Sequence, residues 1–285
     1  MVQHFMMPGR FQCVNPQYSF AVEDWNLCDD CFAGEREIKR RGEIYLPRTE
    51  GQMADPKYGS KRYEAYKYRA NYFNYFASTI HAILGILHRE PPKRIELPLR
   101  LHSMKQEFSA AGDSLEEMLH LVNFYQLLHG RCGMLLDSPF WDDSPNAVPV
   151  CALYPAHRIL DWDQNGNMLS FVLLDESGEQ FDPVKKCREF LPRLRLCALD
   201  QNGEYFSILL TPQEYAAFDF SSEIPERAYP MIRGKRLGKI PFVFTNISDT
   251  TSMIQSPPLL PLANLCLAIY RSEADYRHGL YMQAQ

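Results

Sequence analysis

The sequence predicts an α+β fold in which long helices are followed by an antiparallel β meander and a C-terminal helix. Apolar residues recur at helical spacing in two stretches, residues 61–90 and 114–129. Two Asn-Gly turn signals, beginning at Asn165 and Asn202, each separate a pair of short apolar runs, as β-hairpins require. A helical pattern returns after Ser256. This order of elements favours an α+β architecture.

The composition indicates a soluble globular protein that is long enough to bury a sizeable core. The chain has 285 residues, of which 46% are hydrophobic and 23% are charged. Its net charge is −5 and its pI is about 5.9. It therefore lacks the overall excess of Lys and Arg with which proteins grip nucleic-acid phosphates, although a local basic patch is compatible with these numbers.

The sequence shows neither a signal peptide nor a transmembrane helix. Residues 1–10 lack an apolar core followed by a small-residue cleavage site. The longest apolar run, Leu259–Tyr270, is interrupted by Pro261 and Asn264 and is shorter than the ~20 residues that a bilayer requires. The eight cysteines are scattered and several lie in apolar runs, which predicts buried reduced thiols and a cytosolic compartment.

The N-terminal elements are expected to be short. Phe20–Phe32 predicts a helix, and a turn at Gly42 leads into an extended piece, Glu43–Leu46. Glu50–Ser60 is expected to be a polar loop. The basic run Lys39–Arg41 suits a phosphate-binding patch, but acidic residues on both sides of it favour a solvated face.

Lys61–Glu90 carries the longest helical signal. A single helix of this length would span ~45 Å, and the prolines at 91 and 92 would end it. Its apolar face is expected to pack along a domain core, although the spacing also suits a coiled-coil partner. The positions on that face are Tyr66, Ala70, Phe73, Ala77, Ile80, Leu84 and Leu87.

A second helix leads into the meander. Ser114 and Glu117 match a capping box that opens a helix ending at His129, with Gly130 as its cap. Residues 132–136 are expected to form a buried strand.

Two hairpins and one further strand follow. The first hairpin pairs Ala156–Trp162 with Met168–Leu174, and alternation places Met168 on the core face. The second pairs Leu194–Leu199 with Tyr205–Leu210, and Ile240–Phe244 is another short apolar strand.

The final helix is expected to begin or kink near Leu260, because Pro261 is tolerated only in a first turn, and to end at Gly279. Ser256 is a candidate cap. Its first half is apolar around most of its circumference, so we expect it to need burial on more than one side. Its apolar stripe consists of Leu262, Cys266, Ile269, Tyr270 and Ala274.

Cys28-x-x-Cys31 has the spacing of half a zinc site. A closed site would need two more ligands, for which Cys13 and His4 are the candidates. The alternative, which we favour, is a pair of ordinary thiols on a short helix.

Two other site-like motifs are also incomplete. Asp161-x-Asp163-x-Asn165 matches the first half of a calcium loop, but Val172 stands where a bidentate Glu is needed, so a hairpin is favoured. Gly234–Ile240 lacks both the glycine spacing and the Ser or Thr of a phosphate-binding loop. The sequence therefore predicts no catalytic residue, no metal ligand and no cofactor. The histidines interpreted as structural or surface residues are His81, His88, His129 and His157.

The chain contains an ordered set of residues that resembles the N-terminal half of portal proteins from tailed bacteriophages. The set as a whole carries this resemblance, and no single motif does. The resemblance is greatest to the portal-like group long known only as a domain of unknown function, and it covers nearly the whole chain. The set consists of Trp25, Glu37-Ile38-Lys39 with Gly42, Tyr45-Leu46-Pro47-Arg48, Arg69-Ala70 with Asn74, Gly130-Arg131-x-Gly133-x-Leu135-x-Asp137-x-Pro139, Tyr154-Pro155 with Trp162, Pro257-Pro258-Leu259-Leu260 and Tyr270-Arg271-x-x-Ala274-Asp275-Tyr276.

The resemblance implies a non-enzymatic structural protein of the virion, made in the host cytoplasm. Such proteins form a dodecameric ring at one capsid vertex, through which double-stranded DNA passes. A terminase, the capsid and a tail adaptor bind the ring. It also implies the organisation of the chain: residues 1–140 form the helical part of a wing-like domain, 141–255 its β-rich part, and 256–285 a helix leading toward the stem.

Portal proteins normally continue beyond this helix, so we expect the chain to be a truncated portal that is monomeric or loosely associated on its own. Its final helix is then expected to exchange amide hydrogens faster than Lys61–Glu90, and Leu280–Gln285 to be poorly ordered. The competing hypotheses are a hydrolase or metal-dependent enzyme that uses His157, Asp161 and Asp163, or the cysteine pair, and a non-portal adaptor or scaffold protein.

Overall fold

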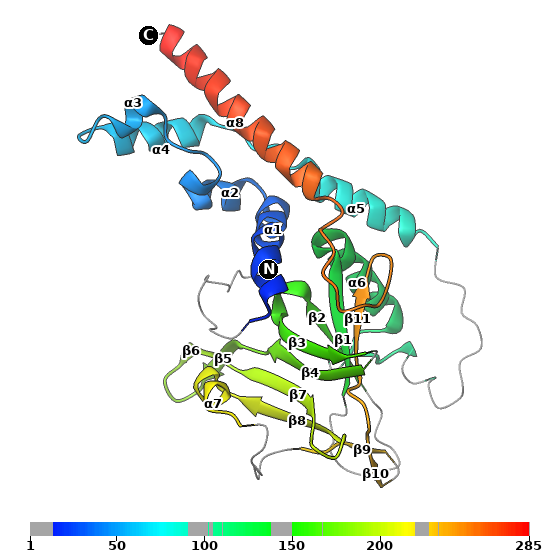
Figure 1. Ribbon diagram of the computed structural model, residues 1–285. Coiled ribbons are helices and arrows are strands. Elements are labelled where there is room, and N and C mark those ends of the chain that lie inside the picture. The colour runs from blue at the N-terminus through cyan, green and yellow to red at the C-terminus, as the bar shows by residue number, and fades with distance from the viewer. Residues whose placement is uncertain are drawn as a thin grey trace.

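The structure combines helices with antiparallel sheets, which confirms the α+β class; most helices lie at one end of the molecule, whereas α7 lies beside the sheets (Figure 1). The computed structural model describes residues 14–90, 102, 105–109, 111–137, 150–166, 168–219, 228–232 and 234–284. An elongated arm of helices extends from a β-rich part, and the last residues of the chain lie at the tip of the arm.

The helical elements are α1 (Pro16–Ala33), α2 (Glu35–Arg41), the 3₁₀ turn η1 (Gly42–Ile44), α3 (Glu50–Met53), α4 (Gly59–Arg69), α5 (Tyr75–Leu87), α6 (Leu115–His129), the 3₁₀ turn η4 (Ala156–Arg158), α7 (Pro212–Ala216) and α8 (Leu260–Gln283). The strands are β1 (Arg131–Asp137), β2 (Val150–Pro155), β3 (Ile159–Asn165), β4 (Met168–Asp175), β5 (Gly178–Asp182), β6 (Cys187–Leu191), β7 (Leu194–Leu199), β8 (Tyr205–Leu210), β9 (Met231–Ile232), β10 (Lys235–Arg236) and β11 (Phe242–Asn246).

Two sheets form the β-rich part, with strand orders β11-β1-β2 and β3-β4-β7-β8. The hairpins β5-β6 and β9-β10 are attached to them, and every ladder between these strands is antiparallel. Both predicted hairpins are present, and β7 and β8 have the predicted bounds. The first hairpin begins three residues late, at Ile159, because Ala156–Arg158 form η4 after Pro155.

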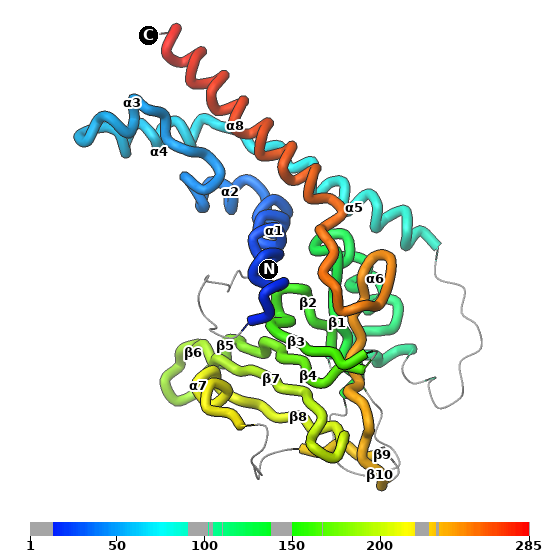
Figure 2. The backbone as a smooth tube through the Cα atoms, viewed as in Figure 1, coloured from blue at the N-terminus to red at the C-terminus, as the bar shows by residue number. Residues whose placement is uncertain are grey.

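The hydrophobic interior divides into two clusters, and α1 contributes to both. Tyr18 and Trp25 pack among the buried side chains of the sheets. One turn later, Cys28 and Cys31 pack among the buried side chains of the helical arm. Figure 2 shows α1 running from the arm down to the sheets. The junction between the two parts of the fold therefore lies along α1.

The helix α8 returns to the N-terminal helices and completes the arm. Cys266, Tyr270 and Ala274 are buried in the same cluster as Phe76 of α5 and Tyr66 of α4. Three of the five residues of the predicted stripe are therefore buried, whereas Leu262 and Ile269 are partly buried; Ala263 and Leu267, outside the predicted stripe, complete the buried face. The arm therefore combines helices from early and late in the sequence: α8 follows the sheets along the chain but lies beside the N-terminal helices.

The single helix predicted over Lys61–Glu90 is wrong, because the chain breaks between α4 and α5. Ala70 is extended, and the side chain of Asn74 caps α5 by accepting from the Ala77 amide at 2.9 Å. Tyr72, between them, is buried and donates to the Cys31 carbonyl. The spacing of four and three continues through this break, although α4 and α5 are separate helices. The residues at that spacing therefore do not share one buried face: Ile80 is buried, whereas Leu87 is exposed.

Other boundaries differ for local reasons. The extended piece Glu43–Leu46 is wrong, because Gly42–Ile44 forms η1, and the polar loop Glu50–Ser60 contains α3, which the Thr49–Gln52 capping box nucleates. The helix α8 begins at Leu260 as predicted, but Leu259, not Ser256, occupies the cap position. It also continues past Gly279.

Candidate functional site

The cysteine pair lies at the interface between α1 and α8. Cys28 and Cys31 are both fully buried, and the Cys31 thiol donates to the Ala263 carbonyl at 3.8 Å. Burial raises the pKa of Cys31 to about 12 and raises that of Cys28 as well. Zinc binds the thiolate form, which this environment disfavours. Cys13 and His4, the proposed additional ligands, lie outside the described residues.

The calcium-like motif forms the end of a hairpin. The Asp161 carboxylate accepts from the Trp162 amide at 2.8 Å, and that of Asp163 accepts from the Ser170 hydroxyl at 2.9 Å. Val172, at the position of the missing ligand, is fully buried in β4. The aspartates therefore serve the turn and its flanking strands.

The two basic segments are paired with carboxylates. In α2, Lys39 lies 2.7 Å from Glu35, and Arg41 lies 2.8 Å from the buried Asp30. In the segment that resembles a phosphate-binding loop, Gly234 turns between β9 and β10 with φ of 71°, and Arg236 pairs with Glu204. The solvated, ion-paired interpretation of the first segment is consistent with these contacts.

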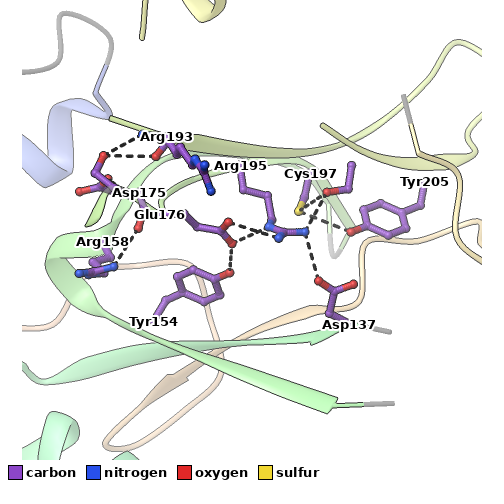
Figure 3. Close-up of polar contacts among 11 residues, drawn as sticks. Asp137, Tyr154, Arg158, Asp175, Glu176, Arg193, Arg195, Cys197 and Tyr205 are labelled. Carbon is purple, nitrogen blue, oxygen red and sulfur yellow. Dashed lines mark hydrogen bonds and ion pairs between the residues drawn. The ribbon is translucent and has the colours of Figure 1, made fainter. Parts of the chain in front are cut away.

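A polar network connects the two sheets, as Figure 3 shows. Arg195 of β7 donates to both carboxylate oxygens of Glu176, at 2.5 and 3.2 Å, and to Asp137 of β1 at 3.1 Å. The hydroxyl of Tyr154 in β2 donates to Glu176 at 2.6 Å. Arg195 and Glu176 therefore form a partly buried ion pair, which Tyr154 and Asp137 each extend by one contact.

The protonation states in this network suit a structural contact. Burial and the neighbouring Glu176 raise the pKa of Tyr154, and the partners of Arg195 raise the pKa of its guanidinium, so both keep their protons. The nearby Cys197 is fully buried, with a pKa raised to about 11, so it is a thiol and not a nucleophilic thiolate. Among these residues we find no poised acid–base pair.

A second polar group lies where α1, α6 and η4 meet. We call Asp29, His129 and His157 the junction group, because one potential ligand atom from each lies within 4.8 Å of those of the other two. His129 Nε2 is 2.8 Å from Asp29 Oδ1. The rings of His129 and His157 are nearly perpendicular, with centroids 5.3 Å apart. His129 is fully buried, Asp29 is buried and His157 is partly buried.

Local structure places each member. The helix α6 stops at His129 because Gly130 adopts a left-handed conformation with φ of 83°. His157 occupies the short turn that Pro155 introduces after β2. Asp29 belongs to four consecutive buried residues of α1, Cys28–Cys31, of which Asp29 and Asp30 are acidic. This acidic pair between two cysteines was the one sequence signal for the group.

The structure thus groups His157 differently from the enzyme hypothesis. Among the described residues, the junction group is the one set of three potential metal ligands at this spacing, and it includes neither Asp161 nor Asp163. An open hollow of about 680 Å³ elsewhere contains two further histidines. Its lining residues are His88, Glu90, Asp113, Glu116, Glu117, His120 and Leu121.

The comparisons with known proteins give no identification. No protein-family model matches the chain, and no curated protein matches it significantly. Within the described ranges, no helix is both long and apolar enough to cross a membrane.

Proposed function

We propose that the protein is a structural portal protein, the head-tail connector of a tailed bacteriophage or prophage. In this role, copies of the chain assemble into a ring at the capsid vertex. The ring is expected to contain twelve copies, as the resemblance to portal proteins implies. Packaging and ejection of DNA occur through the ring, and terminase, capsid and tail-adaptor proteins bind it. The observation that carries the proposal is the ordered set of residues that resembles portal proteins.

Several members of that set lie at the junction of arm and sheets. Trp25 is fully buried and its Nε1 donates to the His129 carbonyl at 3.0 Å, which joins α1 to the end of α6. The buried guanidinium of Arg131 lies 4.8 Å from the centroid of Trp162 and 4.3 Å from that of Phe244. The first contact joins α1 to the end of α6, and the second joins β1 to β3 and β11 within the β-rich part. Members of the set therefore support both the junction of the fold and the packing of its sheets.

The arm offers surface for assembly. A ring in which all copies are equivalent uses two different, complementary surfaces of each chain. Exposed apolar side chains favour protein contact over solvent. On the arm, the large exposed apolar residues include Ile44, Met53, Tyr58, Tyr68, Phe73, Tyr75, Ile86, Leu87, Leu265, Tyr276, Leu280, Tyr281 and Met282.

A portal has to let DNA slide, so tight binding would oppose its function. The net charge of −5 and the carboxylate partners of Lys39 and Arg41 support weak, sequence-independent contact. We expect fluorescence anisotropy with duplex DNA to give weak binding at physiological salt. A sub-micromolar dissociation constant with a steep salt dependence would contradict this part of the proposal.

Electron microscopy across a protein concentration series tests the assembly directly. Ring-shaped particles are expected only at the higher concentrations, because the chain on its own is expected to be monomeric or loosely associated. Leu280→Arg is expected to remove the rings, whereas Val184→Arg, at a residue 89% exposed in the β5-β6 turn, is expected to leave them unchanged. Assemblies at high concentration that are not rings, or rings that Leu280→Arg leaves unchanged, would contradict this assembly and favour an adaptor or scaffold protein.

A further inference from the structure

The backbone on both sides of the junction group is held by hydrogen bonds. Trp25 donates to the carbonyl of His129, and the Tyr18 hydroxyl donates to the carbonyl of His157 at 3.0 Å. The ring of Tyr125 stacks on that of His129, with centroids 5.9 Å apart. Asp29 lies in the last two turns of α1, where the helix fixes its backbone. The group is therefore pre-organised by neighbours that do not belong to it.

Burial makes this arrangement costly without a cation. A carboxylate removed from water needs strong compensation, and a divalent cation among these three side chains would supply it. The Nδ1 atom of His129 is buried and has no hydrogen-bond partner among the described residues, so Nε2, which lies 2.8 Å from Asp29 Oδ1, is the ring nitrogen that an ion between these side chains would bind.

We propose that Asp29, His129 and His157 bind one divalent first-row transition-metal ion, with Zn²⁺ as the representative ion. Two imidazoles and one carboxylate are a donor set that such ions prefer, and they leave one position of a tetrahedral site to water. Zinc bonds to these donors are about 2.0–2.2 Å long, which places ligand atoms roughly 3.3 Å apart. To bind the ion, the 2.8 Å contact between His129 Nε2 and Asp29 Oδ1 has to widen by a few tenths of an ångström. The other ligand atoms of the group, which lie within 4.8 Å of one another, have to move closer together.

The ion would join three elements across the junction of the fold. It takes the place of the proton between His129 Nε2 and Asp29, so the neutral imidazole carries its proton on Nδ1. His157, the partly exposed member, gives the ion a route from solvent. The role is structural and independent of ring assembly. The expectation of no metal rested on the cysteine pair and the calcium-like motif, neither of which contributes here.

Zinc uptake by the full chain tests the proposal. Chelator-treated protein, titrated with Zn²⁺ and followed by calorimetry and elemental analysis, is expected to bind one ion per chain. Asp29→Asn and His157→Gln, which keep side-chain size, are expected to weaken binding at least ~10-fold. Cys28→Ser and His120→Ala, which alter the cysteine pair and the other histidine cluster, are expected to bind as the wild type does.

A second readout does not depend on the variants folding. Co²⁺ bound by the wild type is expected to give visible d–d absorption without the thiolate charge-transfer band that cysteine ligands produce. Stoichiometric zinc is also expected to raise the thermal midpoint, since a ligand of the native state stabilises it. The proposal is overturned if the wild type takes up no stoichiometric ion, if the Co²⁺ complex shows a thiolate band, or if folded Asp29→Asn and His157→Gln bind normally.

Discussion

The hydroxyl of Tyr66 in α4 donates a 2.6 Å hydrogen bond to the carboxylate of Asp275 in α8, across 209 positions of the sequence. Nearby, Arg271 donates to the Tyr45 carbonyl at 2.8 Å, and the guanidinium of Arg69 lies 4.1 Å from the ring centroid of Tyr281. Polar contacts therefore attach the outer half of α8, where apolar burial is small, and they decide how firmly the tip of the arm is held.

Tyr66→Phe is expected to lower the free energy of unfolding by about 1–2 kcal/mol, because it removes a donor to a charged acceptor in a partly buried position. Urea denaturation followed by circular dichroism measures the change. Tyr68→Phe is the matched control, since Tyr68 is 83% exposed and the same atom is removed. Equal stability of the two variants would show that the contact with Asp275 contributes nothing.

Glu176→Ala is expected to destabilise the protein by about 2–3 kcal/mol, because Arg195 and Tyr154 lose their shared acceptor in a partly buried site. Glu179→Ala is the control: its 4.0 Å pair with Arg188 is solvent-exposed, and its loss is expected to cost less than about 0.5 kcal/mol. Chemical denaturation of both variants gives the comparison. If Glu176→Ala lowers the free energy of unfolding no more than the control does, the polar network does not help to hold the sheets together.

Val172→Asp is expected to prevent stable folding, whereas Met168→Asp is expected to be mild. Val172 is fully buried, while Met168 is 50% exposed, so the prediction that Met168 faces the core is wrong. The reason is that β4 pairs with β7 from Phe171 onward, which leaves Met168 on the projecting end of the hairpin. Thermal midpoints of the two variants, with Asn165→Ala as a mild turn control, check the corrected register.

Local chemistry was readable from the sequence where it decides a structure. The Ser114–Glu117 capping box, the left-handed Gly130 and the Asn-Gly turns at Asn165 and Asn202 form the elements that they predict. Periodicity alone gave a wrong prediction at Ala70. An i, i+3, i+4 pattern of apolar residues does not reveal that one helix ends within it and that Asn74 caps the start of another.

The junction group was not predictable in this way. Asp29 and His129 are 100 positions apart, and no spacing rule connects them. Only the packing of α1 against α6 and η4 brings them to His157. Similarly, the bidentate contact of Arg195 with Glu176 depends on how the sheet places the start of β7 beside the end of β4. Contacts of this kind belong to tertiary structure, and one sequence does not encode them as a motif.

Stability is expected to fall as the pH rises above about 9. Burial raises the pKa of Cys31 from 9.0 to about 12 and that of Tyr270 from 10.0 to about 12. Above these ordinary values the unfolded chain has lost protons that the folded chain still holds, so the free energy of unfolding decreases with pH. Burial lowers the pKa of Arg131 to about 10, which acts in the opposite direction only above that pH.

Urea midpoints under reducing conditions at about pH 7, 8.5 and 10.5 measure this dependence. The midpoint is expected to be lowest at the highest pH, because several buried thiols and phenols outweigh one arginine. A midpoint that is unchanged or higher there would mean that these groups ionise in the folded protein.

The two halves of α8 are expected to differ in hydrogen exchange in the monomeric protein. Between Ala263 and Tyr270 the helix buries four residues in the helical cluster, whereas none of residues 275–284 is buried and Tyr276 is 63% exposed. Amide protection follows the free energy of local opening, so the segment 277–283 is expected to exchange faster than 263–270. Mass spectrometry on size-separated protein measures both. If rings form, protection of 277–283 is expected to rise there because the exposed face is covered; equal protection of the two segments in the monomer would show that the polar contacts of Asp275 and Arg69 alone hold the tip of the arm.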